Sequence, residues 1–173
     1  RVRSSAASDV YKRQGRSYDP VEAGIEAYLA MAATLGLQRM VVVQASIYGT
    51  DNACTLDAVE RLGRDRACAV AVVDDSFDAD ALSALDRRGV RGVRFNAVSG
   101  NGTPLEQLET LAQRIAPLGW HLQLYAHGAQ LPALAERLLR LPVPVVIDHM
   151  GQVPTSGGLD SPAFQALSLI HIS

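Results

Sequence analysis

The sequence alternates regularly between short apolar runs and amphipathic stretches, and this alternation constrains the fold more than any other feature. The amphipathic stretches begin at helix-start residues such as Asp19, Asn52 and Asp78, and several end at glycine. Because strands that alternate with helices pair in parallel through crossover connections, the pattern predicts a single α/β domain with a parallel sheet. The predicted strands are 38–46, 67–74, 90–96, 120–126 and 142–149, and the predicted helices are 19–35, 52–63, 78–89, 104–117 and 131–140.

Two architectures fit this alternation. A five-stranded doubly wound sheet would be complete at this length, whereas a (β/α)8 barrel, typically about 250 residues, would be represented by about five of its eight units. No G-x-G-x-x-G fingerprint follows a predicted strand, and GNGTP at 100–104 is interpreted as a turn. The alternation by itself therefore leaves both architectures open.

Composition and charge argue against several classes of partner. The 173 residues carry a formal net charge of -2 and their 16 basic residues are scattered, so nothing favours binding to nucleic acid or to an acidic membrane surface. No apolar stretch reaches the roughly 18 residues that a membrane span needs. Cys54 and Cys68 lack metal or redox spacing. We interpret them as small buried hydrophobes in a reducing compartment, which predicts a cytoplasmic protein.

The two ends differ in pattern from the rest of the chain. Residues 1–14, RVRSSAASDVYKRQ, have no hydrophobic period, and residues 167–173, LSLIHIS, are expected to break off a helix that begins at Pro162. Both ends look like translated sequencing-adaptor stretches, and we interpret them as non-native tails around a domain at 15–166. The natural protein is accordingly expected to be longer at both ends.

Polar side chains gather where the predicted strands end. The carboxyl ends of parallel strands share one edge of a sheet, and in both architectures this is the edge where ligands bind. Side chains alternate between the two faces of a strand, so Tyr125 shares its face with Gln123 and His121. The strand ends supply Gln44, Ser46, Asp74, Asp75, Arg94, Asn96, Tyr125, His127, Asp148 and His149.

The same alternation predicts which of these side chains meet. Arg94 shares its face with Asn96 and with Gly92, and the glycine would leave room beneath the long arginine side chain. An inward His149 would place Asp148 sideways or outward, where it would only support a neighbour. One cavity would then receive Gln44, Asp74, Arg94, Tyr125 and His149.

Each of these side chains also has a purely structural interpretation. Arg94 would form a bridge to Asp74 across neighbouring strands. His149 would be a hydrogen-bonded packing residue, and Tyr125 a half-buried ring whose hydroxyl reaches water. Residues 51–52 are most simply a turn and a helix cap. Convergence at one edge favours a functional site over these single interpretations.

Four sequence blocks resemble a known family. In their order and spacing, VVVQASIYGTDN, GVRGVRFN, GWHLQLYA and PVVIDHMG resemble the amidohydrolase-related (amidohydrolase 2) family, and within it the branch of 2-pyrone-4,6-dicarboxylate lactonase-like dicarboxylic-acid hydrolases. The resemblance spans residues 15–166. It implies a partial TIM-type (β/α)8 barrel that holds roughly strands two to six, and it favours the barrel over the doubly wound sheet.

The resemblance also implies roles for individual residues. His149 corresponds to the active-site histidine at the end of the sixth strand, which makes it the candidate catalytic residue and a candidate metal ligand. Arg94 corresponds to an arginine that binds the substrate carboxylate, and Tyr125 and Tyr18 correspond to tyrosines on the substrate side. The predicted substrate-binding residues are Arg94, Tyr125, Asn96, Tyr18 and Ser46.

The activity implied by the resemblance is hydrolysis of a lactone or similar cyclic ester of a carboxylated small molecule. The branch carries a second arginine where this sequence has Gly100, so a related lactone or a monocarboxylate fits as well as a dicarboxylate. The superfamily often activates water with a divalent metal such as zinc or manganese, whereas this branch is able to work without one; both options stay open.

Two members of the family's active site have no counterpart in the sequence. They are the His-x-His pair of the first strand and the late aspartate of the last strand. Their absence predicts that the chain is an inactive fragment of a hydrolase. A metal-dependent decarboxylase of the same family and a non-catalytic barrel fragment are the alternatives. The expected partner is a small carboxylated substrate, without nucleic acid or membrane, and the oligomeric state is left open.

Overall fold

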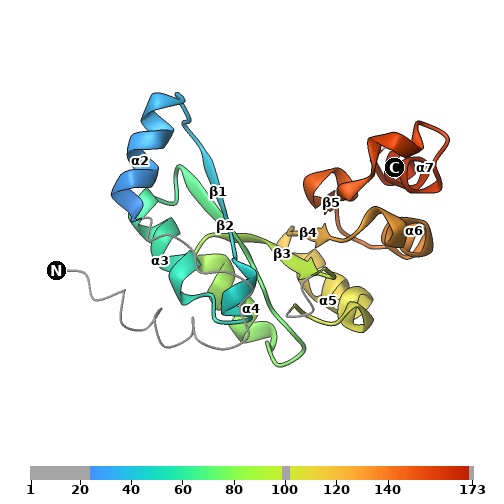
Figure 1. The fold of residues 1–173 in the computed structure, drawn as a ribbon. Coiled ribbons are helices and arrows are strands. Elements are labelled where there is room, and N and C mark those ends of the chain that lie inside the picture. The colour runs from blue at the N-terminus through green and yellow to red at the C-terminus, as the bar shows by residue number, and fades with distance from the viewer. Residues whose placement is uncertain (1–23, 99–101, 172–173) are drawn as a thin grey trace.

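The computed structural model of this chain describes residues 24–98 and 102–171, which form one five-stranded sheet with helices packed against it (Figure 1). The strands are parallel, and their order in the sheet, β1-β2-β3-β4-β5, is their order along the chain. In a doubly wound sheet, the spatial order of the strands would reverse at a switch point. The unreversed order is that of a barrel, so the predicted partial (β/α)8 barrel is confirmed. The strands are β1 (Met40–Val43), β2 (Ala67–Ala71), β3 (Val90–Asn96), β4 (His121–Tyr125) and β5 (Val145–Ile147).

A helix lies between every two successive strands, as the crossover connections of a parallel sheet require. None of the helices within residues 24–98 and 102–171 is long and apolar enough to cross a membrane. The α-helices are α2 (Ile25–Thr34), α3 (Ala53–Leu62), α4 (Ala79–Arg87), α5 (Leu108–Ile115), α6 (Leu131–Leu139) and α7 (Pro162–His171). The short 3-10 helices are η1 (Ser46–Tyr48), η2 (Leu105–Gln107), η3 (Ala116–Leu118), η4 (Gly128–Gln130), η5 (Asp148–Gln152) and η6 (Thr155–Gly157).

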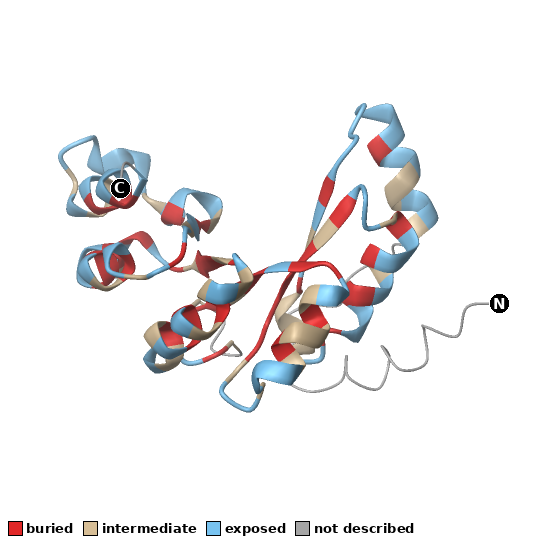
Figure 2. Ribbon diagram, turned by 180° about the vertical axis from the view of Figure 1, so that it is seen from behind, coloured by how far each residue is buried: buried red, intermediate tan, exposed pale blue. Residues whose placement is uncertain are grey.

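The two faces of the sheet differ in burial. Val93, Leu122 and Ile147 belong to the hydrophobic core beneath the helices. On the opposite face, Val41 and Val146 remain 56% and 44% exposed. Figure 2 shows buried residues concentrated on the central strands and on one side of each helix. The hydrophobic core therefore lies between one face of the sheet and its helices.

The strand register brings the predicted site residues onto the face opposite the helices. Leu122 and Leu124 of β4 are fully buried in the core, so the residues that alternate with them point the other way. The shared faces predicted for β3 and β4 are thereby confirmed. The paired residues are Gly92 with His121, Arg94 with Gln123, and Asn96 with Tyr125.

Some element boundaries follow their local signals and others do not. Asp78 caps α4 as predicted, because its carboxylate accepts a 2.8 Å hydrogen bond from the backbone N–H of Ala81. The last strand is shorter than the predicted 142–149. Pro142 and Pro144 have no N–H to donate to a neighbouring strand, and the chain turns directly after Ile147.

Helix α7 continues without interruption to His171, so the prediction that residues 167–173 break it off is wrong. Leu167 and Ile170 lie one helical turn apart, and both are buried as α7 packs on α6. This apolar stripe explains why the helix persists. Residues 1–14 lie outside the described part of the chain, and the non-native origin of the two ends stays a prediction.

Candidate functional site

Arg94 is the centre of a polar network at the carboxyl ends of the strands. Its side chain is only 11% exposed, and its Nε donates a 3.0 Å hydrogen bond to Oδ2 of Asp148, directly after β5. Its Nη1 lies 3.5 Å from both the carbonyl oxygen of Gln44 and Oγ of Ser46, which follow β1. The guanidinium carbon lies 5.4 Å from the ring centroid of Tyr125, within cation–π distance. Arg94 thus connects both ends of the sheet.

Asp148 is the acid that pairs with Arg94, so the bridge expected between Arg94 and Asp74 is wrong. Oδ1 of Asp148 also accepts a 2.6 Å hydrogen bond from Nε2 of Gln123. The prediction that Asp148 points sideways or outward is wrong as well. Ile147 is the residue that turns toward the helices and is buried in the core, so Asp148 reaches the opposite face.

Ser46 and Asn96 form a second contact between strand ends. Nδ2 of Asn96 donates a 2.5 Å hydrogen bond to Oγ of Ser46, and Oδ1 of Asn96 accepts one of 3.0 Å from the N–H of Val98. Because β1 and β3 are not neighbours in the sheet, this contact draws the two strand ends together over β2. The structure therefore places both predicted residues beside Arg94, and their role in substrate binding stays a prediction.

Tyr125 lies between Arg94 and a left-handed turn formed by residues 149–152. The ring of Tyr125 meets the imidazole of His149 edge-on, with centroids 5.0 Å apart and planes at 76°. The hydroxyl of Tyr125 accepts a 2.7 Å hydrogen bond from Nε2 of Gln152. The structure thus brings His149 to the network, with its side chain on the exposed side.

The turn itself has an uncommon backbone. Its φ values are 50° at His149, 51° at Met150, 64° at Gly151 and 49° at Gln152. A left-handed conformation costs about 1–2 kcal/mol for each residue other than glycine. Strand alternation holds through Asp148 and ends at His149, where φ becomes positive, so the turn, not the strand, places His149 beside Tyr125.

Gln44 and Asp74 hold local structure and do not present their side chains to a common cavity, contrary to prediction. Nε2 of the buried Gln44 donates to the carbonyl oxygens of Gly49 and Asp51, at 3.1 and 2.8 Å. The carboxylate of Asp74 accepts hydrogen bonds from the backbone N–H and the hydroxyl of Ser76. Gln44 contributes to the network only through its backbone carbonyl.

Other predicted residues lie away from the network or outside the described residues. The exposed His127 caps η4 together with Gln130, and Asp75 is exposed in the loop after β2. Tyr18 and Gly100 lie outside the described residues.

Gln123 and Gln152 belong to the network although sequence reasoning gave them no role. Gln123 had a detectable signal, because alternation places it on the same face as Tyr125. Gln152 had none, since a left-handed turn of three non-glycine residues cannot be expected from an otherwise ordinary loop sequence.

Gly92 makes room for His121 and not for Arg94, which corrects the prediction. A Cβ at Gly92 would lie 2.5 Å from Cε1 of the His121 ring. Burial of this ring lowers the pKa of His121 below its ordinary value, opposed by a hydrogen bond to the backbone of Arg91. His121 therefore packs beneath the network as a predominantly neutral ring at pH 7.

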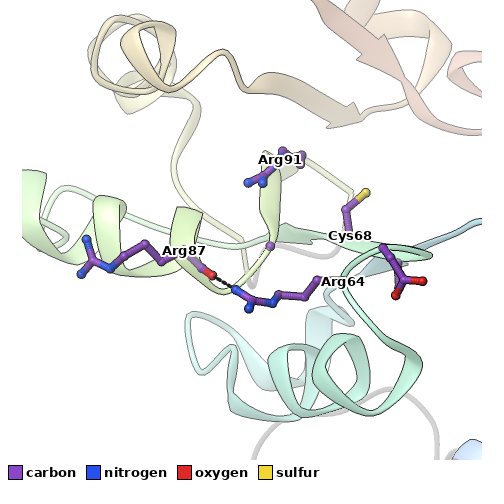
Figure 3. A pocket seen from close by; sticks show the side chains of 7 residues that line it. Arg64, Cys68, Arg87 and Arg91 are labelled. Atoms are coloured by element: carbon purple, nitrogen blue, oxygen red, sulfur yellow. Dashed lines mark hydrogen bonds between the residues drawn. The ribbon is translucent and has the colours of Figure 1, made fainter.

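A separate pocket of about 330 Å³ lies at the opposite edge of the sheet, at the starts of β2 and β3. Figure 3 shows Arg64, Cys68, Arg87 and Arg91 around it, with Arg64 donating to the backbone carbonyl of Arg87. Because the strands are parallel, their starts lie at the edge opposite the network around Arg94. The pocket is therefore no part of that network.

Comparison with known proteins identifies the family of this chain. The model of a family described as amidohydrolase matches residues 4–171, nearly the whole chain. The chain belongs to the amidohydrolase family. It is 41% identical over 151 residues to a 2-pyrone-4,6-dicarboxylate hydrolase of Comamonas testosteroni, covering 86% of this chain and 49% of the relative. It is 35% identical over 155 residues to a 4-sulfomuconolactone hydrolase of Hydrogenophaga intermedia, covering 88% and 51%.

A solved structure agrees with the fold. The crystal structure of a probable 2-pyrone-4,6-dicarboxylic acid hydrolase from Acinetobacter baumannii, with citric acid bound, superimposes with a TM-score of 0.78 at 28% identity. The match covers 91% of this chain and 60% of that one. This amidohydrolase chain spans about half the length of the curated relatives it matches.

The described residues do not by themselves fit the divalent metal that many amidohydrolases use. Residues 24–98 and 102–171 contain no group of three or more His, Cys, Asp or Glu side chains that could hold a metal ion. Beside His149, the nearest acid in sequence is Asp148, whose two oxygens already accept from Arg94 and Gln123. To hold a metal, His149 would therefore need further ligands from outside the described residues.

Proposed function

We propose that this amidohydrolase chain is part of a hydrolase that opens a lactone or similar cyclic ester of a carboxylated small molecule. The observation that most supports this proposal is the placement of Arg94. Its side chain is 11% exposed and lies at the carboxyl ends of the strands, the edge where barrels bind ligands. A planar guanidinium matches a carboxylate through parallel N–H···O bonds, which makes arginine a selective anchor for such a substrate.

The related proteins support this substrate class. Two relatives are named as hydrolases of 2-pyrone-4,6-dicarboxylate and of 4-sulfomuconolactone, and the solved structure holds citric acid. The named substrates combine a cyclic ester with an anionic group. An anion anchor beside a hydrolytic centre is the arrangement that such substrates require.

The described residues suggest a division of roles. Arg94 binds the anionic group, and Tyr125 orients the substrate from the adjacent strand. His149, exposed beside Tyr125, polarises the ester carbonyl and stabilises negative charge on its oxygen as water adds. The ring C–O bond then breaks, and the proton released by the attacking water neutralises the leaving oxygen.

The 173-residue chain is proposed to be inactive by itself. Its four histidines include no His-x-His pair, and Asp160, the one aspartate after His149, is exposed in a turn and follows no strand, so it does not match the base that would take the proton from water. Assays with 2-pyrone-4,6-dicarboxylate should therefore show no turnover above background for this chain. Turnover by the purified 173-residue chain would disprove this part of the proposal.

The complete gene product provides the test of substrate class. In that protein, Arg94→Gln should lower kcat/KM for a carboxylated lactone about 10- to 100-fold, the loss expected for hydrogen bonds between charged groups. Arg94→Lys keeps the positive charge but loses the planar pair of N–H donors. Its kcat/KM should therefore lie between that of the unaltered protein and that of Arg94→Gln. Arg91→Gln, on the same strand but outside the network, is the matched control and should leave kcat/KM unchanged.

The neutral methyl ester of the same lactone separates binding of the anion from general damage. Its hydrolysis should be nearly insensitive to Arg94→Gln. Equal losses for the acid and the ester would refute the role of Arg94, and release of carbon dioxide without ring opening would identify a decarboxylase.

A further inference from the structure

Asp148 joins two strands that carry the site. Its side chain is 12% exposed, and its two oxygens accept from different donors, Nε of Arg94 on β3 and Nε2 of Gln123 on β4. Both oxygens of the carboxylate are therefore engaged with side chains of the site. Its position points to a role that acts through Arg94.

The contacts of Arg94 show what this role is. Asp148 occupies only Nε, while Nη1 makes contacts no shorter than 3.5 Å. Nη2 forms no hydrogen bond within the described residues. The ring of Tyr125 packs against the guanidinium group and limits its movement. Asp148 therefore leaves the outer nitrogens of the fork for a ligand and holds the fork in one direction.

We propose that Asp148 is a positioning residue that aims the guanidinium of Arg94 at the anionic group of the substrate. The inference rests on the proposed function, in which Arg94 binds that group. An arginine held by one partner loses less rotational freedom when it binds a ligand, so affinity rises without a new contact to the ligand. Asp148 thus determines selectivity for anionic substrates without touching them.

The variant Asp148→Asn tests this in the complete gene product. The amide removes the charge and turns an NH2 group toward one of the two N–H donors that the carboxylate served. KM for 2-pyrone-4,6-dicarboxylate should rise about tenfold while kcat stays within about twofold, since the anchor and not the reacting centre is disturbed. KM for the neutral dimethyl ester should stay unchanged, whereas a merely structural role would affect both substrates equally.

Combination with Arg94→Gln provides a second readout. If Asp148 acts through Arg94, Asp148→Asn has no further effect on KM once Arg94 has been replaced. Glu109→Gln is the matched control. It breaks the ion pair between Glu109 and Arg137, with a 2.6 Å contact between α5 and α6 and no contact with Arg94 or Asp148, and it should leave the ratio of acid to ester KM unchanged.

If Asp148→Asn fails to fold, a second variant that keeps the ion pair between Arg94 and Asp148 still tests the inference. Gln123→Met removes only the second donor to Asp148, and should raise KM for the dicarboxylate about threefold in the same selective way. An unchanged KM ratio in every folded variant of Asp148 and Gln123 would overturn the inference, as would tighter binding of the dicarboxylate by Asp148→Asn. If Arg94→Gln lowers kcat/KM equally for the acid and the ester, the proposed function is refuted, and this outcome is distinct from failure of the inference on Asp148.

Discussion

Replacement of Asn52 by alanine should destabilise the protein substantially. The side chain is 5% exposed and forms three hydrogen bonds. Its Nδ2 donates to the carbonyl oxygens of Val72 at 2.8 Å and Thr50 at 2.9 Å, and its Oδ1 accepts from the N–H of Val72 at 2.9 Å. Asn52 thus pairs with the chain just after β2 as a neighbouring strand would. It also secures the end of the loop that carries Ser46.

The size of the effect follows from what Asn52→Ala leaves behind. Three hydrogen bonds at about 1 kcal/mol each give a loss of about 3 kcal/mol, and Val72, which is 4% exposed, would keep a buried donor and a buried acceptor without partners. Folded proteins have a total free energy of unfolding of about 5–15 kcal/mol, so this loss is a large fraction of it.

Urea denaturation of the complete gene product measures this loss. With a slope of about 2 kcal/mol/M, the midpoint should fall by about 1.5 M. The control is Asp51→Ala, whose exposed carboxylate accepts a 3.1 Å hydrogen bond from the N–H of Ala53, and which should cost about 1 kcal/mol or less. Equal midpoints for the two variants would refute the reasoning.

Three further predictions concern His121, its glycine neighbour and the open face of the sheet. Gly92→Ala should destabilise by about 1–3 kcal/mol through overpacking against the His121 ring, and a second change, His121→Ala, should recover much of this loss in the urea midpoint. Because burial lowers the pKa of His121 in the folded state, the unfolded chain binds the proton first as the pH falls. The free energy of unfolding should therefore decline as the pH drops below about 6.5, and His121→Gln should flatten this dependence in urea titrations at a series of pH values. The 173-residue chain alone should aggregate or bind the dye ANS as a molten state, because Val41, Val43 and Val146 are exposed on one face; a sharp, cooperative melt of a monomer would contradict this.

Parts of the fold with strong local signals are predictable from the sequence. The boundaries of β3, Val90–Asn96, agree with prediction because Gly89 ends the preceding helix and the next residues form a clear strand pattern. The gathering of Arg94, Asn96 and Tyr125 at one edge follows from parallel pairing alone. The choice between a barrel and a doubly wound sheet required the family resemblance, since alternation fits both.

The partners within the site were not predictable, because they depend on how the chain bends. Asp74 follows the strand next to that of Arg94, and Asp148 lies two strands away, so sequence order favours the wrong acid. The predicted orientation of Asp148 assumed an extended chain through His149. The chain turns left-handed there, which local propensity disfavours and tertiary contacts with Tyr125 support.

The shared carboxylate of Asp148 has a consequence for altering this protein. Arg94 and Gln123 come from β3 and β4, and Asp148 directly follows β5, so a shift of any one strand by a single residue would turn its side chain to the other face. The contacts among the three residues therefore help to fix the register of three strands. Replacing Arg94 to change the accepted substrate also removes one of these register-fixing contacts. Replacing Arg94 and Asp148 together, by a pair that still bridges the strands, is the route that changes recognition and keeps the alignment.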